Sequence, residues 1–70
     1  MNYKIRPDDK FIFIDIDPDE SYTLPKKNIY AVSKCLNDIT IYMKGGFKIN
    51  IYLNDEDTIA NIYLDIIAEL

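Results

Sequence analysis

The chain has 70 residues and a formal net charge of −4, from eight lysine and arginine residues and twelve aspartate and glutamate residues. Hydrophobic residues make up 49% and charged residues 29%, which is too apolar for a disordered tail. The length leaves room for a single core, so we expect one domain over residues 1–70. The net charge has the wrong sign for a phosphate backbone, so we expect no direct binding to nucleic acid.

Cysteine and histidine usage limits the available chemistry. Cys35 is the single cysteine, and the chain has no histidine, so no internal disulfide can form and the commonest zinc ligand is missing. We expect no metal and no other cofactor, and we interpret Cys35 as a small buried hydrophobic residue. The N-terminus lacks the apolar segment of a signal peptide, and no stretch approaches the roughly 20 apolar residues that span a bilayer. We therefore expect a cytoplasmic protein, of a bacterium or of an infected host cell, without a membrane partner.

The N-terminal half reads as short strands. Residues 3–6 alternate apolar and polar side chains and predict an edge strand, and residues 11–17 are β-branched or aromatic at nearly every position and predict a second strand. Residues 21–24 predict a third. The pattern of residues 26–36 is ambiguous, since it fits both a helical stripe and a strand alternation, and we favour the strand.

Residues 39–43 and 47–53 predict a β-hairpin whose register follows from the pattern. A two-residue Gly45-Gly46 turn would set the apolar side chains of one strand beside the polar side chains of the other. A three-residue loop of Lys44, Gly45 and Gly46 with a glycine bulge removes that conflict. It pairs Met43 with Phe47, Ile41 with Ile49 and Ile39 with Ile51, which makes one face apolar. The opposite face then carries Thr40, Tyr42, Lys48, Asn50 and Tyr52.

The C-terminal segment predicts an amphipathic helix. Asn54 and Asp55 are good N-cap residues, and the acidic residues that follow suit the helix dipole. Apolar residues recur at three- and four-residue spacing: Ile59, Ile62, Tyr63, Ile66, Ile67 and Leu70. We expect this stripe to cover the apolar face of the hairpin. The predicted fold is α+β, a small antiparallel sheet of three to five strands with a C-terminal amphipathic helix packed on one face.

Two catalytic or metal-binding motifs are suggested by residues 11–21. Residues 11–17 resemble the first motif of haloacid dehalogenase-type phosphatases, an apolar strand that ends in Asp-x-Asp, but Pro18 replaces the usual glycine and 70 residues cannot hold the remaining ligands. The spacing from Asp15 to Ser21 is similar to the opening of an EF-hand loop, but Glu20 and Lys26 stand where glycine and a bidentate glutamate are required. We interpret these carboxylates as a solvated strand end and expect no catalytic residues.

Aromatic and acidic residues on expected outer faces are the candidate binding residues. If Ile12, Ile14 and Ile16 face the helix, the phenylalanines between them join the hairpin tyrosines on the other face, where tyrosine favours an interface. The alternative is that the N-terminal segments cover this face. The candidate partner-binding residues are Tyr42, Tyr52, Asn50, Phe11, Phe13, Asp15, Asp17, Asp19 and Glu20.

These features predict a small non-enzymatic protein-binding module. In size and charge the chain is similar to the acidic inhibitors, such as anti-CRISPR proteins, that phages direct against host nucleases and defence complexes. That likeness implies a nuclease or another nucleic-acid-binding protein as partner, approached by mimicry of nucleic acid through the acidic residues. The alternative is a homo-oligomeric assembly protein whose second sheet face is buried in a two-fold homodimer. The element order of residues 21–70 is similar to that of small flagellar proteins of the FlbD type.

Overall fold

The computed structural model describes residues 2–70 and confirms the α+β class. The elements in chain order are β1 (Tyr3–Pro7), β2 (Phe11–Ile16), β3 (Glu20–Pro25), a 3-10 helix η1 (Lys26–Asn28), β4 (Ile29–Cys35), β5 (Asp38–Met43), β6 (Lys48–Tyr52) and α1 (Glu56–Ala68). The strands form two antiparallel sheets of three strands, β1-β2-β3 (sheet A) and β4-β5-β6 (sheet B), instead of one.

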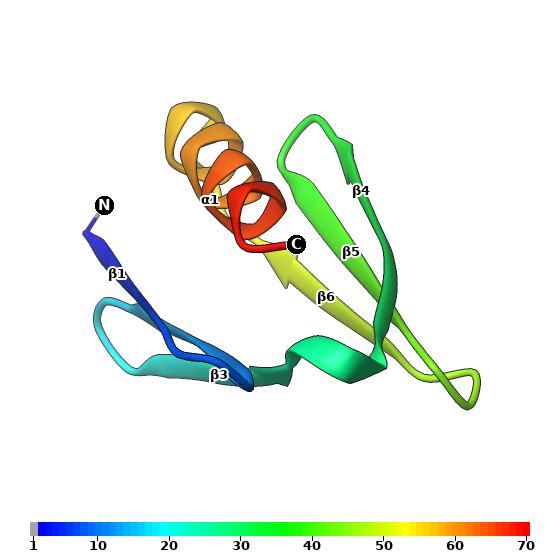
Figure 1. Ribbon diagram of the computed structural model, residues 1–70. Helices are drawn as coiled ribbons and strands as arrows, with labels where there is room; N and C mark the ends of the chain where they lie inside the picture. The colour runs from blue at the N-terminus through cyan, green and yellow to red at the C-terminus, as the bar shows by residue number, and fades with distance from the viewer. Residues whose placement is uncertain (1) are drawn as a thin grey trace.

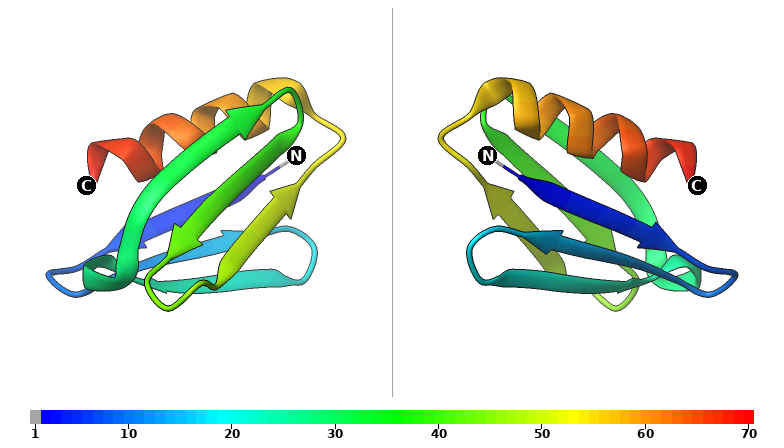
Figure 2. Two further views of the ribbon diagram at one scale, coloured as in Figure 1. Left: turned by 90° about the vertical axis from the view of Figure 1, so that its right-hand side faces the viewer. Right: turned by 90° about the vertical axis from the view of Figure 1, so that its left-hand side faces the viewer.

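The two sheets form a wedge with the helix across its open side. Figure 1 shows sheet A and sheet B diverging from η1, with α1 lying opposite η1. Figure 2 shows the same arrangement from two sides, with α1 running over the strands. The core fills the space between, and its members are Ile12, Ile14, Ile16, Leu24, Ile39, Ile41, Met43, Ile51, Leu53, Ile59, Ile62 and Ile66. Most of the core therefore comes from isoleucines on one face of β2, β5, β6 and α1.

Strand β2 is the central strand of sheet A, between β1 and β3. Ile12, Ile14 and Ile16 are buried, as their alternation predicts. The side chains between them point to the outer face of the sheet. Strand β1 is an edge strand, which confirms the prediction for residues 3–6.

Sheet B confirms the predicted hairpin register. Ile39 pairs with Ile51 and Ile41 with Ile49, and the Met43 N–H donates to the Phe47 carbonyl at 2.8 Å. The loop contains two glycines with positive φ, 90° at Gly45 and 87° at Gly46. Residues 29–35 of the ambiguous segment are strand β4, as favoured, and residues 26–28 form η1.

Phe47 departs from the prediction that it lies on the apolar face. Its side chain is 71% exposed, because it stands at the tip of the hairpin, before β6 begins, where neither the helix nor sheet A provides apolar partners. It packs instead on its own loop, with a ring atom 3.4 Å from where a Cβ of Gly45 would lie. The apolar face of the hairpin therefore ends at Met43.

Helix α1 begins and packs as predicted over most of its length. Asp55 is the N-cap, and its carboxylate accepts from the Thr58 N–H at 3.2 Å and from the Thr58 hydroxyl at 2.7 Å. The buried stripe is narrower than expected, because Ile67 lies 42% exposed on the flank of the helix and Leu70 lies 57% exposed beyond its end. Within the described part of the chain, no helix is long and apolar enough to cross a membrane.

Two side-chain contacts hold the helix to the N-terminal half. The Tyr3 hydroxyl donates to Asp65 at 2.8 Å, and Lys26 Nζ lies 3.4 Å from a carboxylate oxygen of Glu69. The first contact joins α1 to an edge strand of sheet A, and the second joins it to the connection between the two sheets. Both therefore fix the helix over the open side of the wedge.

Cys35 is exposed, which corrects the expectation that it is buried. It ends β4, an edge strand of sheet B, immediately before a turn in which Leu36 adopts a positive φ of 54°. A residue in this position projects beyond the covered part of the sheet. The thiol is therefore accessible, although its short apolar side chain suggested a place in the core.

Candidate functional site

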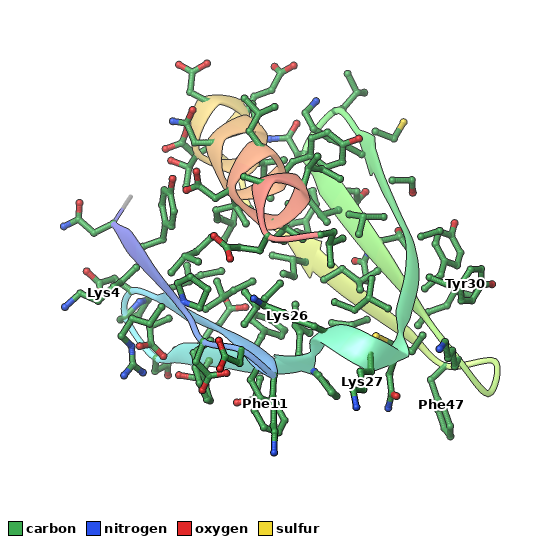
Figure 3. The ribbon with its side chains drawn as sticks, viewed as in Figure 1. Lys4, Phe11, Lys26, Lys27, Tyr30 and Phe47 are labelled. Atoms are coloured by element: carbon green, nitrogen blue, oxygen red, sulfur yellow. The ribbon has the colours of Figure 1, made fainter. Side chains whose placement is uncertain are left out.

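The outer face of sheet B, with its hairpin tip, carries a set of accessible aromatic rings that we call the aromatic face: Tyr30, Tyr42, Phe47 and Tyr52. Tyr30 is 66%, Phe47 71% and Tyr52 58% exposed, whereas Tyr42 is half-buried. Tyr42 and Tyr52 lie outside because strand alternation opposes them to the buried isoleucines of β5 and β6. Tyr30 sits where the register between β4 and β5 shifts. Figure 3 shows Tyr30 and Phe47 pointing away from the helix.

Contacts within the aromatic face hold one end of it in place. The rings of Tyr30 and Tyr42 lie 6.1 Å apart in a tilted arrangement, and Lys48 Nζ lies 6.0 Å from the centroid of the Tyr42 ring. In the middle of the face, the Asn50 amide donates to the Ile39 carbonyl at 3.3 Å and to the Thr40 hydroxyl at 3.4 Å. These contacts restrict the rotamers of the side chains that make them.

The aromatic face is positively charged although the chain is acidic. Lys27, Lys44 and Lys48 are exposed, and none of them forms an ion pair within residues 2–70. The charge is divided along the sequence: residues 26–54 carry five lysines and one acidic residue, Asp38, for a net charge of +4. Residues 1–25 carry a net charge of −3, and residues 55–70 carry five acidic residues and no basic one. The net charge of −4 therefore conceals a basic segment, that of sheet B, which follows the acidic segment of sheet A in the sequence and precedes the acidic helix.

Phe11 and Phe13 lie on a different surface from the hairpin tyrosines. They occupy the outer face of sheet A, where their rings are 5.9 Å apart and the Arg6 guanidinium lies 5.6 Å from the Phe13 ring. Both are half-buried. The expectation that these rings join Tyr42 and Tyr52 on one face is wrong, because the strands divide into two sheets that face different directions.

The predicted acidic residues belong to sheet A and its β2–β3 turn. Asp15 accepts from the Ser21 hydroxyl at 2.8 Å and from Arg6 at 3.2 Å, and these contacts, with the serine bond the larger cause, hold the pKa of Asp15 below its usual value. Asp17 and Asp19 are exposed in the turn. Asp15 and Asp17 also line a shallow hollow of about 350 Å³. The structure therefore places these carboxylates around sheet A and none of them on the aromatic face.

Glu20 serves its own strand. It accepts a hydrogen bond from the Tyr22 hydroxyl at 2.8 Å. Burial, and secondarily this carboxylate, raises the pKa of Tyr22 to about 12. Glu20 is half-buried, and its carboxylate already has a hydrogen-bond partner within β3.

Tyr30, Phe47, Lys27 and Lys44 were not predicted as members of the site, and Lys48 was placed on the outer hairpin face but was not counted as a binding residue. Tyr30 lies in the segment whose pattern fits both helix and strand, and Phe47 alternates in phase with the half-buried Ile49 and the buried Ile51 of β6. The lysines were summed into a single net charge. The charge of each segment would have indicated them, because residues 26–54 carry a net charge of +4 in an acidic chain.

Within residues 2–70, no three acidic or cysteine side chains are arranged to hold a metal ion. Comparison with models of known protein families gave no match, and neither did comparison with curated proteins or with solved structures. The aromatic face is thus defined by its own geometry, and it is the surface on which a functional proposal can be based.

Proposed function

We propose that the chain is a small non-enzymatic binding module that attaches to another protein through the aromatic face. The observation that carries this proposal is the exposure of Tyr30, Phe47 and Tyr52 beside an ordered Tyr30–Tyr42 pair. Exposed aromatic surface on a small domain commonly marks an interface, and tyrosine supplies a large rigid area with a polar tip. Asn50 and Thr40 provide hydrogen-bonding groups between the two ends of the face.

The lysines around the aromatic face give the encounter its direction. Lys27, Lys44 and Lys48 are unpaired within the described residues, so they attract an acidic partner surface and raise the association rate more than the final affinity. The rings then supply the desolvated anchors that hold the complex. The acidic residues of sheet A face elsewhere, and mimicry of nucleic acid is not part of the proposal.

The proposed role is inhibition of a larger cytoplasmic protein or complex, of the kind that small phage and mobile-element proteins exert on host nucleases and defence complexes. Small size and a compact, preordered surface support this role, because such a surface can block a partner without chemistry of its own. A free, exposed cysteine suits a reducing compartment.

Single-stranded nucleic acid is the competing ligand for a basic aromatic sheet face, and the charge pattern disfavours it. Asp38 pairs with Tyr52 at the end of the face away from the hairpin tip, so the face changes sign along its length. A strand with uniform negative charge would meet repulsion there and again beside the acidic helix. A protein segment can match both ends.

The experiment that tests the proposal is affinity capture from a lysate of the source cell or host, followed by titration of the identified partner. We expect Tyr30→Ser and Tyr52→Ser each to weaken partner binding by about tenfold or more, as hot-spot tyrosines do. Leu70→Ser is the matched control, because Leu70 is similarly exposed, at 57%, but lies beyond the end of the helix and outside the aromatic face. Circular dichroism verifies that all three variants fold.

Two results would overturn the proposal. The first is a partner whose affinity is unchanged in both tyrosine variants. The second is tight binding of a single-stranded oligonucleotide that those variants abolish, which would reassign the aromatic face to nucleic acid.

A further inference from the structure

Helix α1 has a second apolar surface that faces away from the core. Leu64 is 61% and Ile67 42% exposed, and Ala60 is half-buried beside them. At 3.6 residues per turn, Glu56 lies on the same side of the helix as these three residues, four positions before Ala60. Asp57 lies at the edge of this side. We call these five residues the outer helix face.

The outer helix face and the aromatic face are complementary in charge. Glu56 and Asp57 form no ion pair within residues 2–70, and no basic residue follows Lys48 in the sequence. The outer helix face thus combines exposed aliphatic side chains with unpaired carboxylates, whereas the aromatic face combines exposed rings with unpaired lysines. Opposite charge around apolar centres is the pattern of two surfaces that fit each other.

The two faces cannot meet within one molecule. Sheet B lies between them, because α1 packs on its inner side and the aromatic rings project from its outer side (Figures 1 and 3). Any contact between the two faces must therefore join separate molecules.

We infer that the aromatic face of one molecule binds the outer helix face of a second copy, head to tail. This inference goes beyond the proposed function and uses the same docking surface. It differs from the two-fold dimer with facing sheets, which would bring together two faces that each carry Lys44 and Lys48. A head-to-tail contact leaves one face of each kind free, so the copies add further or close into a ring.

Self-association of this kind regulates access to the aromatic face. A copy whose aromatic face is occupied by a helix cannot bind its partner protein through that face, so partner and second copy compete. The contact relies on exposed charges, which salt screens within about 10 Å at an ionic strength of ~0.1 M. We therefore expect association that rises with concentration and falls with added salt.

Sedimentation velocity of the purified chain tests the inference directly. We expect the weight-average mass to rise between about 10 μM and 1 mM in ~0.05 M salt and to return to that of a monomer in ~0.5 M salt. The double variants Lys44→Glu/Lys48→Glu and Glu56→Lys/Asp57→Lys should each remain monomeric. Mixing the two variants should restore association, because each reversed face then meets a complementary one.

A third variant guards against misfolding, since lysine in the first turn opposes the helix dipole. Leu64→Lys changes the middle of the outer helix face instead, and it should also give a monomer. A wild-type chain that stays monomeric at ~1 mM in low salt would overturn the inference, as would self-association that the helix variants leave intact. Neither result affects partner binding at low concentration, whereas a partner affinity that Tyr30→Ser and Tyr52→Ser leave unchanged overturns only the proposed function.

Discussion

Replacement of Ile62 by alanine measures how much the wedge depends on the buried stripe of α1. Ile62 is 0% exposed, and the substitution removes every side-chain atom beyond Cβ. At about 0.8 kcal/mol per buried methylene, transfer alone costs roughly 2.4 kcal/mol, and the remaining cavity raises the loss to about 3–4 kcal/mol. A chain of this length has a free energy of unfolding of roughly 4–10 kcal/mol. The variant should therefore lose a third or more of its stability.

Urea unfolding followed by far-ultraviolet circular dichroism gives this loss as a lower midpoint at unchanged slope. Leu64→Ala is the matched control on the same helix, and because Leu64 is 61% exposed its cost should stay within about 0.5 kcal/mol. The measurement is made on dilute protein, where self-association is absent. Equal losses in the two variants would refute the assignment of the helix faces, and with it the outer helix face.

Three further predictions concern single sites. Asp55→Ala should cost about 1 kcal/mol of stability at neutral pH through loss of the helix cap. Contacts with Thr58 lower the pKa of Asp55 in the folded chain, so this contribution exists above the unfolded pKa and disappears as the pH falls through the folded pKa. Urea titrations of wild type and variant at several pH values will show this loss. Gly46→Ala should lower the stability measured in thermal unfolding by about 1 kcal/mol. The cause is the φ of 87° alone, since an added Cβ meets nothing within 4 Å, and Gly46→Asn should therefore cost less. Tyr22, whose pKa rises to about 12, should ionise at a higher pH than an ordinary tyrosine in an ultraviolet titration. Its contribution to stability should be lost as the pH rises above 10, and Tyr22→Phe should remove this pH-dependent loss.

The hairpin and the helix were predictable because local pattern and final structure agree there. The alternation of Ile39, Ile41, Ile49 and Ile51 permits one register with an apolar face, and the structure adopts it. The N-cap of α1 follows equally directly from Asp55. In both cases neighbouring residues contain the whole physical reason for the structure.

The division into two sheets was not predictable by the same reasoning. It depends on η1 at Lys26–Asn28, three polar residues that break the strand run between Pro25 and Ile29. Nothing in their spacing fixes the direction in which the chain turns, because that direction follows from packing both sheets against α1. This one tertiary feature separates Phe11 and Phe13 from Tyr42 and Tyr52, so the candidate site changed although every one of these residues lies on an outer sheet face as predicted.

The net charge of the whole chain is a poor guide to binding, because an approaching molecule responds to the charges near its point of contact. The molecule measures 29 × 23 × 21 Å, whereas salt screens charges beyond about 8–10 Å under physiological conditions. A group approaching the aromatic face therefore responds mainly to Lys27, Lys44 and Lys48, and hardly to the carboxylates of sheet A. The acidic net charge describes the segments of the helix and of sheet A, whereas the segment of sheet B is basic. Under the proposed function the aromatic face selects acidic surfaces, and the outer helix face of a second copy is among the surfaces that meet this requirement.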